Sequence, residues 1–113
     1  MRTFGLQVDQ LAPGVVCLHV EGEFDVHHVY EFDQELRALE DTGATTVVVD
    51  LREVPFVDSA GLSRLLAAQR RARSNGHRLA VVRGCRAIER LFALTAMNHT
   101  LELVSAPESV LAR

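Results

Sequence analysis

The chain has 113 residues, 48% of them hydrophobic, which is enough for one folded domain with a core but not for two. Its formal net charge of -3 gives no general attraction to nucleic acid or to an anionic membrane surface. No apolar run approaches the roughly 20 residues of a membrane-spanning helix, and residues 1–6 lack the apolar core of a signal peptide. We therefore expect a cytoplasmic protein in which residues 1–113 form one domain.

The N-terminal part of the chain predicts a β-hairpin. Strands at Thr3–Val8 and Val15–Val20 flank the turn residues Asp9–Gly14, which end in Pro-Gly. Alternation along the second strand predicts two faces, with Val16, Leu18 and Val20 on one side and Val15, Cys17 and His19 on the other.

A helix is expected next, at Val26–Asp41. Its apolar residues recur at helical spacing, and Thr42-Gly43 supplies the glycine that commonly follows a helix end. The stripe consists of Val29, Phe32, Leu36 and Leu39. The strand predicted at Thr45–Leu51 is β-branched and apolar without alternation, which is typical of a strand covered on both faces.

The second half of the chain alternates helices and strands. We expect a helix at Ser59–Ser74, a strand at Leu79–Val82, a helix at Arg86–Thr95, a strand at Leu101–Val104 and a short C-terminal helix opened by the capping-box spacing of Ser105 and Glu108. The order ββαβαβαβα predicts an α/β fold, with a mixed central sheet whose first strand is antiparallel and helices packed on it.

One edge of this sheet should gather residues that are distant in sequence. The carboxyl ends of parallel strands lie along the same edge, so the loops that carry Asp25, Asp58-Ser59 and Arg83–Arg86 should meet there. Ser59 stands at a helix N-terminus, where free backbone N–H groups favour an anion. Such a serine can be an inert cap, a nucleophile or a phosphate carrier. Asp58 is the alternative cap, and its use would leave the serine hydroxyl exposed.

The nucleophile interpretation is the weakest of the three. The stretch Val57–Gly61 lacks the first glycine of the G-x-S-x-G elbow, and neither His77 nor His99 is clearly placed to act as a base. We therefore expect no enzyme.

The sequence also gives little sign of a metal or redox site. His27 and His28 are adjacent on a predicted helix and do not share one face. Cys17 and Cys85 are expected to be small buried side chains rather than a disulfide or a metal-binding pair. No metal and no cofactor are expected.

The stretch from Asp50 to Leu62, DLREVPFVDSAGL, resembles the signature of anti-sigma factor antagonists built on the STAS domain, D-L-x-x-V-x-F-x-D-S-x-G-L. A looser similarity extends over residues 21–25, 70–82 and 88–95, and so over nearly the whole chain. The resemblance implies a single STAS domain that binds an anti-sigma factor, itself an ATP-binding serine kinase, and so releases a sigma factor. It also implies that the kinase phosphorylates Ser59 and ends the binding, and that a phosphatase restores it. ATP and Mg²⁺ would belong to the kinase.

The resemblance further implies a set of partner-binding residues on two loops and the start of the second predicted helix: Asp25, Asp58, Ser59, Ala60, Gly61, Leu62 and Arg64. Ala60 departs from the family, which often has Ser or Thr there, so Ser59 is the sole hydroxyl of the loop. Asp25 resembles the acidic residue that closes the family's Gly-x-x-Asp turn. Three roles are open for it: to orient the serine hydroxyl, to help bind the kinase, or to cap the first predicted helix. Gly61 reflects either a close approach to the loop or simple helix-start geometry.

Two other functions remain open. One is a STAS scaffold subunit of a signalling or lipid-transport complex, in which the serine is not phosphorylated. A small-ligand sensor that uses the same loops is the other alternative.

Overall fold

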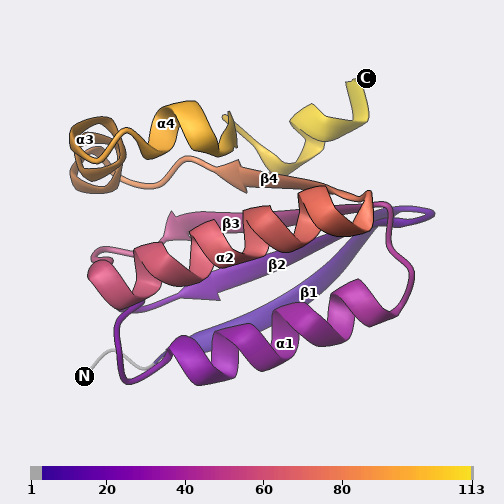
Figure 1. Ribbon diagram of the computed structural model, residues 1–113, viewed down its shortest axis with the longest axis horizontal. Coiled ribbons are helices and arrows are strands. Elements are labelled where there is room, and N and C mark those ends of the chain that lie inside the picture. The colour runs from indigo at the N-terminus through magenta and orange to yellow at the C-terminus, as the bar shows by residue number, and fades with distance from the viewer. Residues whose placement is uncertain (1–3, 113) are drawn as a thin grey trace.

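The computed structural model describes residues 4–112, in which five strands form one sheet and helices pack on it (Figure 1). The elements in chain order are β1 (Gly5–Ala12), β2 (Val15–Glu21), α1 (Val29–Asp41), β3 (Thr46–Glu53), α2 (Ser59–Asn75), β4 (Arg78–Val82), α3 (Arg86–Leu94), α4 (Met97–Thr100), β5 (Glu102–Val104) and the 3-10 helix η1 (Pro107–Ala112). The strands lie in the order β1-β2-β3-β4-β5. The pair β1–β2 is antiparallel and the other three pairs are parallel, which confirms the predicted α/β fold with a mixed sheet.

The N-terminal hairpin is longer than predicted. β1 continues to Ala12, so only Pro13 and Gly14 form the turn, and Gly14 has the positive φ of 76° that suits glycine. The polar residues of the expected turn instead pair with β2, with Asp9 opposite Cys17. Cross-strand pairing therefore outweighs local turn propensity in this segment. Thr3, where the predicted strand begins, lies outside the described residues.

The first helix begins later than predicted, at Val29 rather than Val26, because the three preceding residues form a turn. The predicted apolar stripe of α1 is buried as expected. Gly43 follows the end of α1 with a φ of 82°, which confirms the predicted glycine, and Gly76 follows α2 in the same way with a φ of 75°.

The C-terminal part departs most from the prediction. The four-residue helix α4 was not expected, because so short an element has no readable periodicity. The final segment is a 3-10 helix rather than an α-helix, and its i→i+3 bonding includes Ser109 N–H donating to Ala106 O at 3.1 Å.

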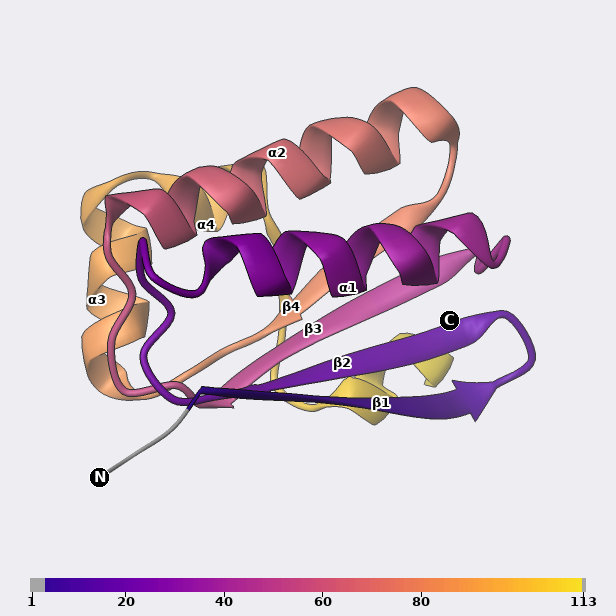
Figure 2. The same cartoon turned by 90° about the horizontal axis from the view of Figure 1, so that it is seen from below.

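The two faces of the sheet are covered differently (Figure 2). Helices α1 and α2 lie over one face, which we call the helix face, and η1 lies against the opposite face, which we call the open face. The main core is on the helix face and includes Phe24, Phe32, Leu18, Leu36 and Leu65. A smaller cluster on the open face consists of Cys17, Val48, Ala80, Val82 and Val110.

Strand β3 contributes to both clusters, with Val47, Val49 and Leu51 in the main core and Val48 in the smaller one. This explains why these four residues are all apolar, without the alternation of a strand covered on one face. Among residues 4–112, no helix is both long and apolar enough to cross a bilayer.

Candidate functional site

The loops that follow β2 and β3 are joined by main-chain contacts. Phe24 and Val57 form an isolated parallel bridge. The Phe24 N–H donates to Phe56 O at 2.9 Å, and the Asp58 N–H donates to Phe24 O at 3.3 Å. Residues 54–61, which we call the serine loop, are therefore held directly against the loop between β2 and α1, as the predicted topology requires.

Asp58 is the cap of α2. Its Oδ1 accepts from the Gly61 N–H at 3.0 Å, and its Oδ2 accepts from the Val26 N–H at 3.1 Å. One carboxylate thus satisfies the first turn of α2 and also ties the two loops together. The Gly61 N–H is the largest cause that lowers the pKa of Asp58 below its ordinary value, so this carboxylate is ionised at neutral pH.

Ser59 is the first residue of α2 and is exposed. Because Asp58 occupies the cap position, the possibility that the serine itself caps the helix is wrong, and the alternative with an exposed hydroxyl is the one found. Within residues 4–112, no other residue forms a hydrogen bond with the Ser59 hydroxyl. The oxygen is therefore accessible to another molecule.

Gly61 is required by close packing. A Cβ atom at this position would lie 2.6 Å from Phe24 O and 2.9 Å from Val57 Cγ1, which is closer than such atoms approach in proteins. Of the two explanations given for this glycine, close approach of the loops is the one that the structure supports.

Asp25 organises its own turn. Its Oδ1 accepts from the His27 N–H at 3.0 Å and lies 2.9 Å from His28 Nδ1. Its carbonyl accepts from the N–H groups of His28 and Val29. These bonds give Asp25 a structural role in the turn that precedes α1. It is not the cap of this helix, because the N-cap residue is His28, and no side chain within residues 4–112 caps the helix.

The remaining predicted docking residues differ in accessibility. Arg64 is exposed, whereas Ala60 and Leu62 are half-buried and pack against the core. Sequence reasoning missed two apolar side chains at the same place, Phe56 at 48% exposed and Val26 at 61% exposed. The sequence did hold a signal for Phe56: a large aromatic residue in a loop, rather than on the apolar stripe of a helix, indicates a side chain that is available for contact.

The loop between β4 and α3 packs against the base of the serine loop. A Cβ at Gly84 would lie 2.9 Å from Leu51 O, and Cys85 Sγ lies 3.9 Å from Val54 O. Cys85 is exposed, so the prediction that both cysteines are buried is wrong for this one, which stands at the N-cap of α3 on the edge of the fold. Arg83 and Arg86 are also exposed, and Arg83 pairs with Glu89 at 3.8 Å.

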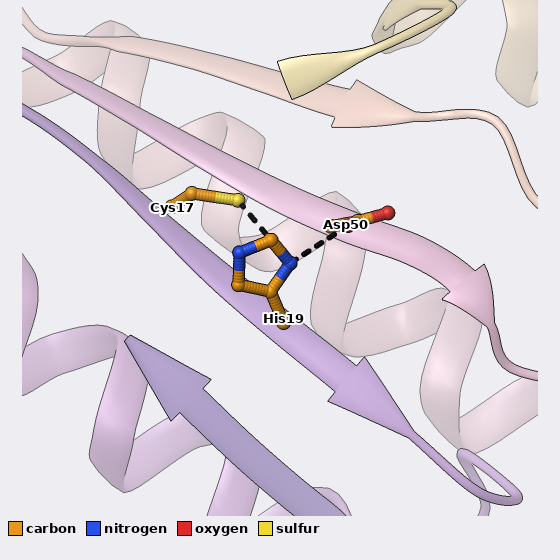
Figure 3. A group of neighbouring side chains, drawn as sticks. All are labelled: Cys17, His19 and Asp50. Carbon is orange, nitrogen blue, oxygen red and sulfur yellow. Dashed lines mark hydrogen bonds and ion pairs between the residues drawn. The ribbon is translucent and has the colours of Figure 1, made fainter. Parts of the chain in front are cut away.

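A second polar group lies on the open face and was not predicted (Figure 3). His19 Nδ1 is 2.7 Å from Asp50 Oδ2, and the Arg52 side chain donates to both Asp50 oxygens at 3.0 and 2.9 Å. Burial of Asp50 opposes its ionisation, but the hydrogen bonds from Arg52 and His19 outweigh it and lower the pKa of Asp50. We call Asp9, Cys17, His19, Asp50 and Arg52 the open-face cluster.

Cys17 is the fully buried member of this cluster. Burial, followed by the negative charges of Asp50 and Asp9, raises the pKa of its thiol to about 12. The prediction that Cys17 is a small buried side chain is confirmed.

Comparison with known proteins gives one consistent result. The sequence profile of the family described as "Mlab, STAS domain" matches residues 8–105. The anti-sigma-B factor antagonist of Staphylococcus aureus (strain NCTC 8325 / PS 47) is 27% identical over 89 residues, which cover 79% of this chain and 82% of that protein. A crystal structure of an anti-sigma factor antagonist from Mycobacterium paratuberculosis superposes with a TM-score of 0.86 at 25% identity, over 97% of this chain and 92% of the other.

The fold is also shared with SpoIIAA, at 19% identity. The TM-score is 0.77 for its unphosphorylated form, over 94% of this chain and 93% of the other. For the phosphorylated form of the Bacillus protein it is 0.72, over 94% and 96%.

Proposed function

The chain belongs to the STAS domain family, and from this premise we propose that it is an anti-sigma factor antagonist, which binds an anti-sigma factor and so releases a sigma factor. Antagonists of this kind are regulatory binding proteins rather than enzymes. The finer proposal is that the anti-sigma factor is an ATP-dependent serine kinase, that it phosphorylates Ser59, and that a phosphatase reverses this. Such a role belongs in the cytoplasm, where sigma factors work.

The exposed hydroxyl of Ser59 is the observation that carries this proposal. Asp58 takes over the capping of α2, so Ser59 has no structural duty that a modification would disturb. A phosphate would add roughly -1.5 to -2 charges at pH 7 next to the already ionised Asp58. The modification therefore alters the charge of the surface while leaving the contacts that fix the loop in place.

The position of the serine at a helix start also explains how the fold tolerates the phosphate. Backbone N–H groups and the positive end of the α2 dipole favour an anion there. SpoIIAA has a similar fold, and its structure is known in both the unphosphorylated and the phosphorylated form. We therefore expect the switch to act by repelling a partner rather than by refolding the domain.

The proposed docking surface surrounds Ser59. It comprises Asp25, Asp58, Ser59, Ala60, Gly61, Leu62 and Arg64, to which the exposed side chains of Val26 and Phe56 are added. Within this set, Asp58 and Gly61 shape the loop, whereas Ser59, Arg64 and Phe56 are exposed for direct contact. Burial of a new dianion against a partner would be costly on this surface, which already carries the ionised Asp58 and the exposed apolar side chains of Val26 and Phe56.

Incubation of the full chain with its candidate kinase and Mg-ATP tests the proposal. Intact-mass measurement should show one added phosphate in the wild type and in Ser63→Ala, and none in Ser59→Ala. Ser63 is the matched control because it is an exposed serine on the same helix. A mass gain that survives Ser59→Ala would contradict the assignment of the site.

Binding to the same anti-sigma factor tests the switch itself. Ser59→Ala should bind like the wild type without ATP and keep binding with it, whereas Ser59→Asp should remain folded and bind at least tenfold more weakly. A wild-type chain that binds its partner, gains no phosphate and displaces no sigma factor would instead favour a STAS scaffold subunit.

A further inference from the structure

The open-face cluster brings together three side chains of the types that bind transition metals. His19 on β2 is the register partner of Asp50 on β3, and Cys17 precedes His19 by two residues on the same face of the strand (Figure 3). Parallel pairing of two central strands fixes all three Cα positions. The arrangement is therefore set by the sheet and does not depend on a loop.

The distances between the donor atoms suit one small ion. Cys17 Sγ lies 3.9 Å from His19 Nδ1, which lies 2.7 Å from Asp50 Oδ2, and the three atoms all lie within 4.8 Å of one another. Ligands of a tetrahedral zinc ion, at about 2.0–2.3 Å from the metal, are roughly 3.3–3.6 Å apart. Adjustments of less than an ångström for the two closer pairs would bring them to this spacing.

The chemistry of the donors selects the class of metal. A thiolate, an imidazole nitrogen and a carboxylate oxygen form a mixed set that suits Zn²⁺ and its analogue Co²⁺ rather than the all-oxygen sites of Mg²⁺ or Ca²⁺. Cys17 is fully buried and Asp50 is 5% exposed, so two of the three donors are fixed by their surroundings. We propose that Cys17, His19 and Asp50 bind one divalent zinc-type ion, with water at the fourth position.

Asp9 supplies a supporting contact of the kind that metal-binding histidines use. Its Oδ2 lies 3.5 Å from His19 Nε2, on the side of the ring away from Asp50. With Nδ1 on the metal, the ring proton resides on Nε2 and is donated to this carboxylate, which fixes the tautomer and the ring orientation. The cluster thus contains a carboxylate–histidine pair already directed at the proposed ion.

The surface is hollowed beside two of the three donors, His19 and Asp50. A hollow of about 360 Å³ on the surface is lined by side chains that include Asp9, His19, Asp50, Arg52 and Glu53. Arg52 competes for the Asp50 oxygens, but its side chain is about half exposed and can move into solvent. Binding releases the thiol proton of Cys17 to solvent, and the site then holds a thiolate and a carboxylate against the 2+ charge of the ion.

Cobalt titration of the full chain, stripped with a chelator and kept reduced without a thiol, tests the proposal. Co²⁺ should bind with a stoichiometry of one and produce a thiolate-to-cobalt charge-transfer band in the near ultraviolet, which Zn²⁺ then abolishes by displacement. Cys85→Ser is the matched control, because it removes the other cysteine, and it should leave the band unchanged.

The variants separate the roles of the donors. Cys17→Ala should remove the band, and His19→Gln should weaken Co²⁺ binding at least tenfold. Asp9→Asn should weaken Co²⁺ binding by about 10- to 100-fold, the usual cost of losing a supporting contact, and should keep the band at saturation. If the wild type gives no band at millimolar Co²⁺, or if Cys85→Ser removes it, the proposal is overturned. Neither result bears on Ser59 phosphorylation, so the two proposals stand or fall separately.

Discussion

The serine loop and the open-face cluster are both anchored by an aspartate of the same segment of chain, yet they are built in different ways. In the serine loop, Asp58 binds backbone N–H groups, and main-chain bonds to Phe24 fix the loop. In the open-face cluster, Asp50 binds the side chains of His19 and Arg52, which come from two neighbouring strands. The first region is therefore a shape made by backbone, and the second is a charge network made by side chains.

This difference decides how each region responds to change. The stability of a loop held by backbone bonds is sensitive to added atoms that push two chain segments apart. It is insensitive to the identity of a side chain that the loop exposes to solvent, such as that of Ser59. A side-chain network depends on its central carboxylate, and it can rearrange because His19 and Arg52 reach water. Substitutions in the two regions should therefore follow different rules.

The largest effect is expected from Gly61→Ala, which breaks the serine loop. The added Cβ meets the Phe24 carbonyl oxygen, a backbone atom that cannot rotate away, so we expect a loss of about 3 kcal/mol in the free energy of unfolding. Denaturant titration measures this. Gly5→Ala is the control, because its Cβ would meet nothing closer than Glu21 Oε1 at 3.8 Å, and equal losses in the two variants would contradict the close-approach argument.

Asp50→Ala should have the next largest effect, of about 2 kcal/mol, because it removes the carboxylate shared by His19 and Arg52. The loss stays below that of a fully buried ion pair, since the side chains of His19 and Arg52 are 32% and 48% exposed and can be solvated. Asp9→Ala, which removes an exposed partner of the same histidine, should cost about 0.5 kcal/mol or less. The same denaturant titration compares the two variants. A larger loss for Asp9→Ala than for Asp50→Ala would contradict the central role of Asp50 in the network.

Asp58→Ala should cost about 1 kcal/mol, the usual loss of an N-cap. Asp58→Asn retains an acceptor and should cost less. Amide hydrogen exchange gives the sharper measurement, because the N–H groups of Val26 and Gly61 should both lose protection in the alanine variant. Protection that persists at Val26 would show that the carboxylate does not link the two loops.

Acid should weaken both regions through these two carboxylates. Their pKa values are lower in the folded protein than the ordinary 3.8, so the unfolded chain takes up protons first. The stability that they contribute is fully present above pH 3.8 and is lost as the pH falls through their folded-state pKa values. As the pH is lowered from 6, the free energy of unfolding should fall less steeply in an Asp50→Asn, Asp58→Asn double variant than in the wild type. An identical slope would contradict the assignment of this pH dependence to the two carboxylates.

The smallest effect is expected from Ser59→Ala, which should change the free energy of unfolding by less than about 0.5 kcal/mol. Within residues 4–112, the Ser59 hydroxyl takes part in none of the hydrogen bonds that hold the loop. Calorimetry on the Ser59→Ala sample used for partner binding would show whether the substitution leaves stability unchanged while it alters the response of binding to ATP. A loss as large as that of Asp58→Ala would mean that the serine supports the loop after all.

The serine loop was largely predictable from sequence because its determinants are contiguous. The residue types at 58 and 59 indicate a helix cap and a hydroxyl at the helix start. The structure was needed to choose between Asp58 and Ser59 as the cap, and between close approach and helix-start geometry as the reason for Gly61. The buried stripe of α1 and the apolar run at the start of β3 were predictable for the same reason, since the pattern of apolar residues is a local signal.

The open-face cluster was not predictable because its members meet only through strand register. Alternation did place Cys17 and His19 on one face, but nothing local indicates that Asp50 lies opposite His19. The exposure of Cys85 and the 3-10 form of η1 were missed because both are set by how a segment packs on the rest of the fold, which no local pattern encodes.

The contrast between the two cysteines offers a practical handle. Cys85 is exposed and its sulfur lies 3.9 Å from Val54 O at the root of the serine loop, whereas in the metal-free chain Cys17 is fully buried and its thiol is protonated. A maleimide dye would therefore attach at one position in the unmodified chain. Its fluorescence would report arrival and departure of a bound partner in real time, with no engineered residue needed.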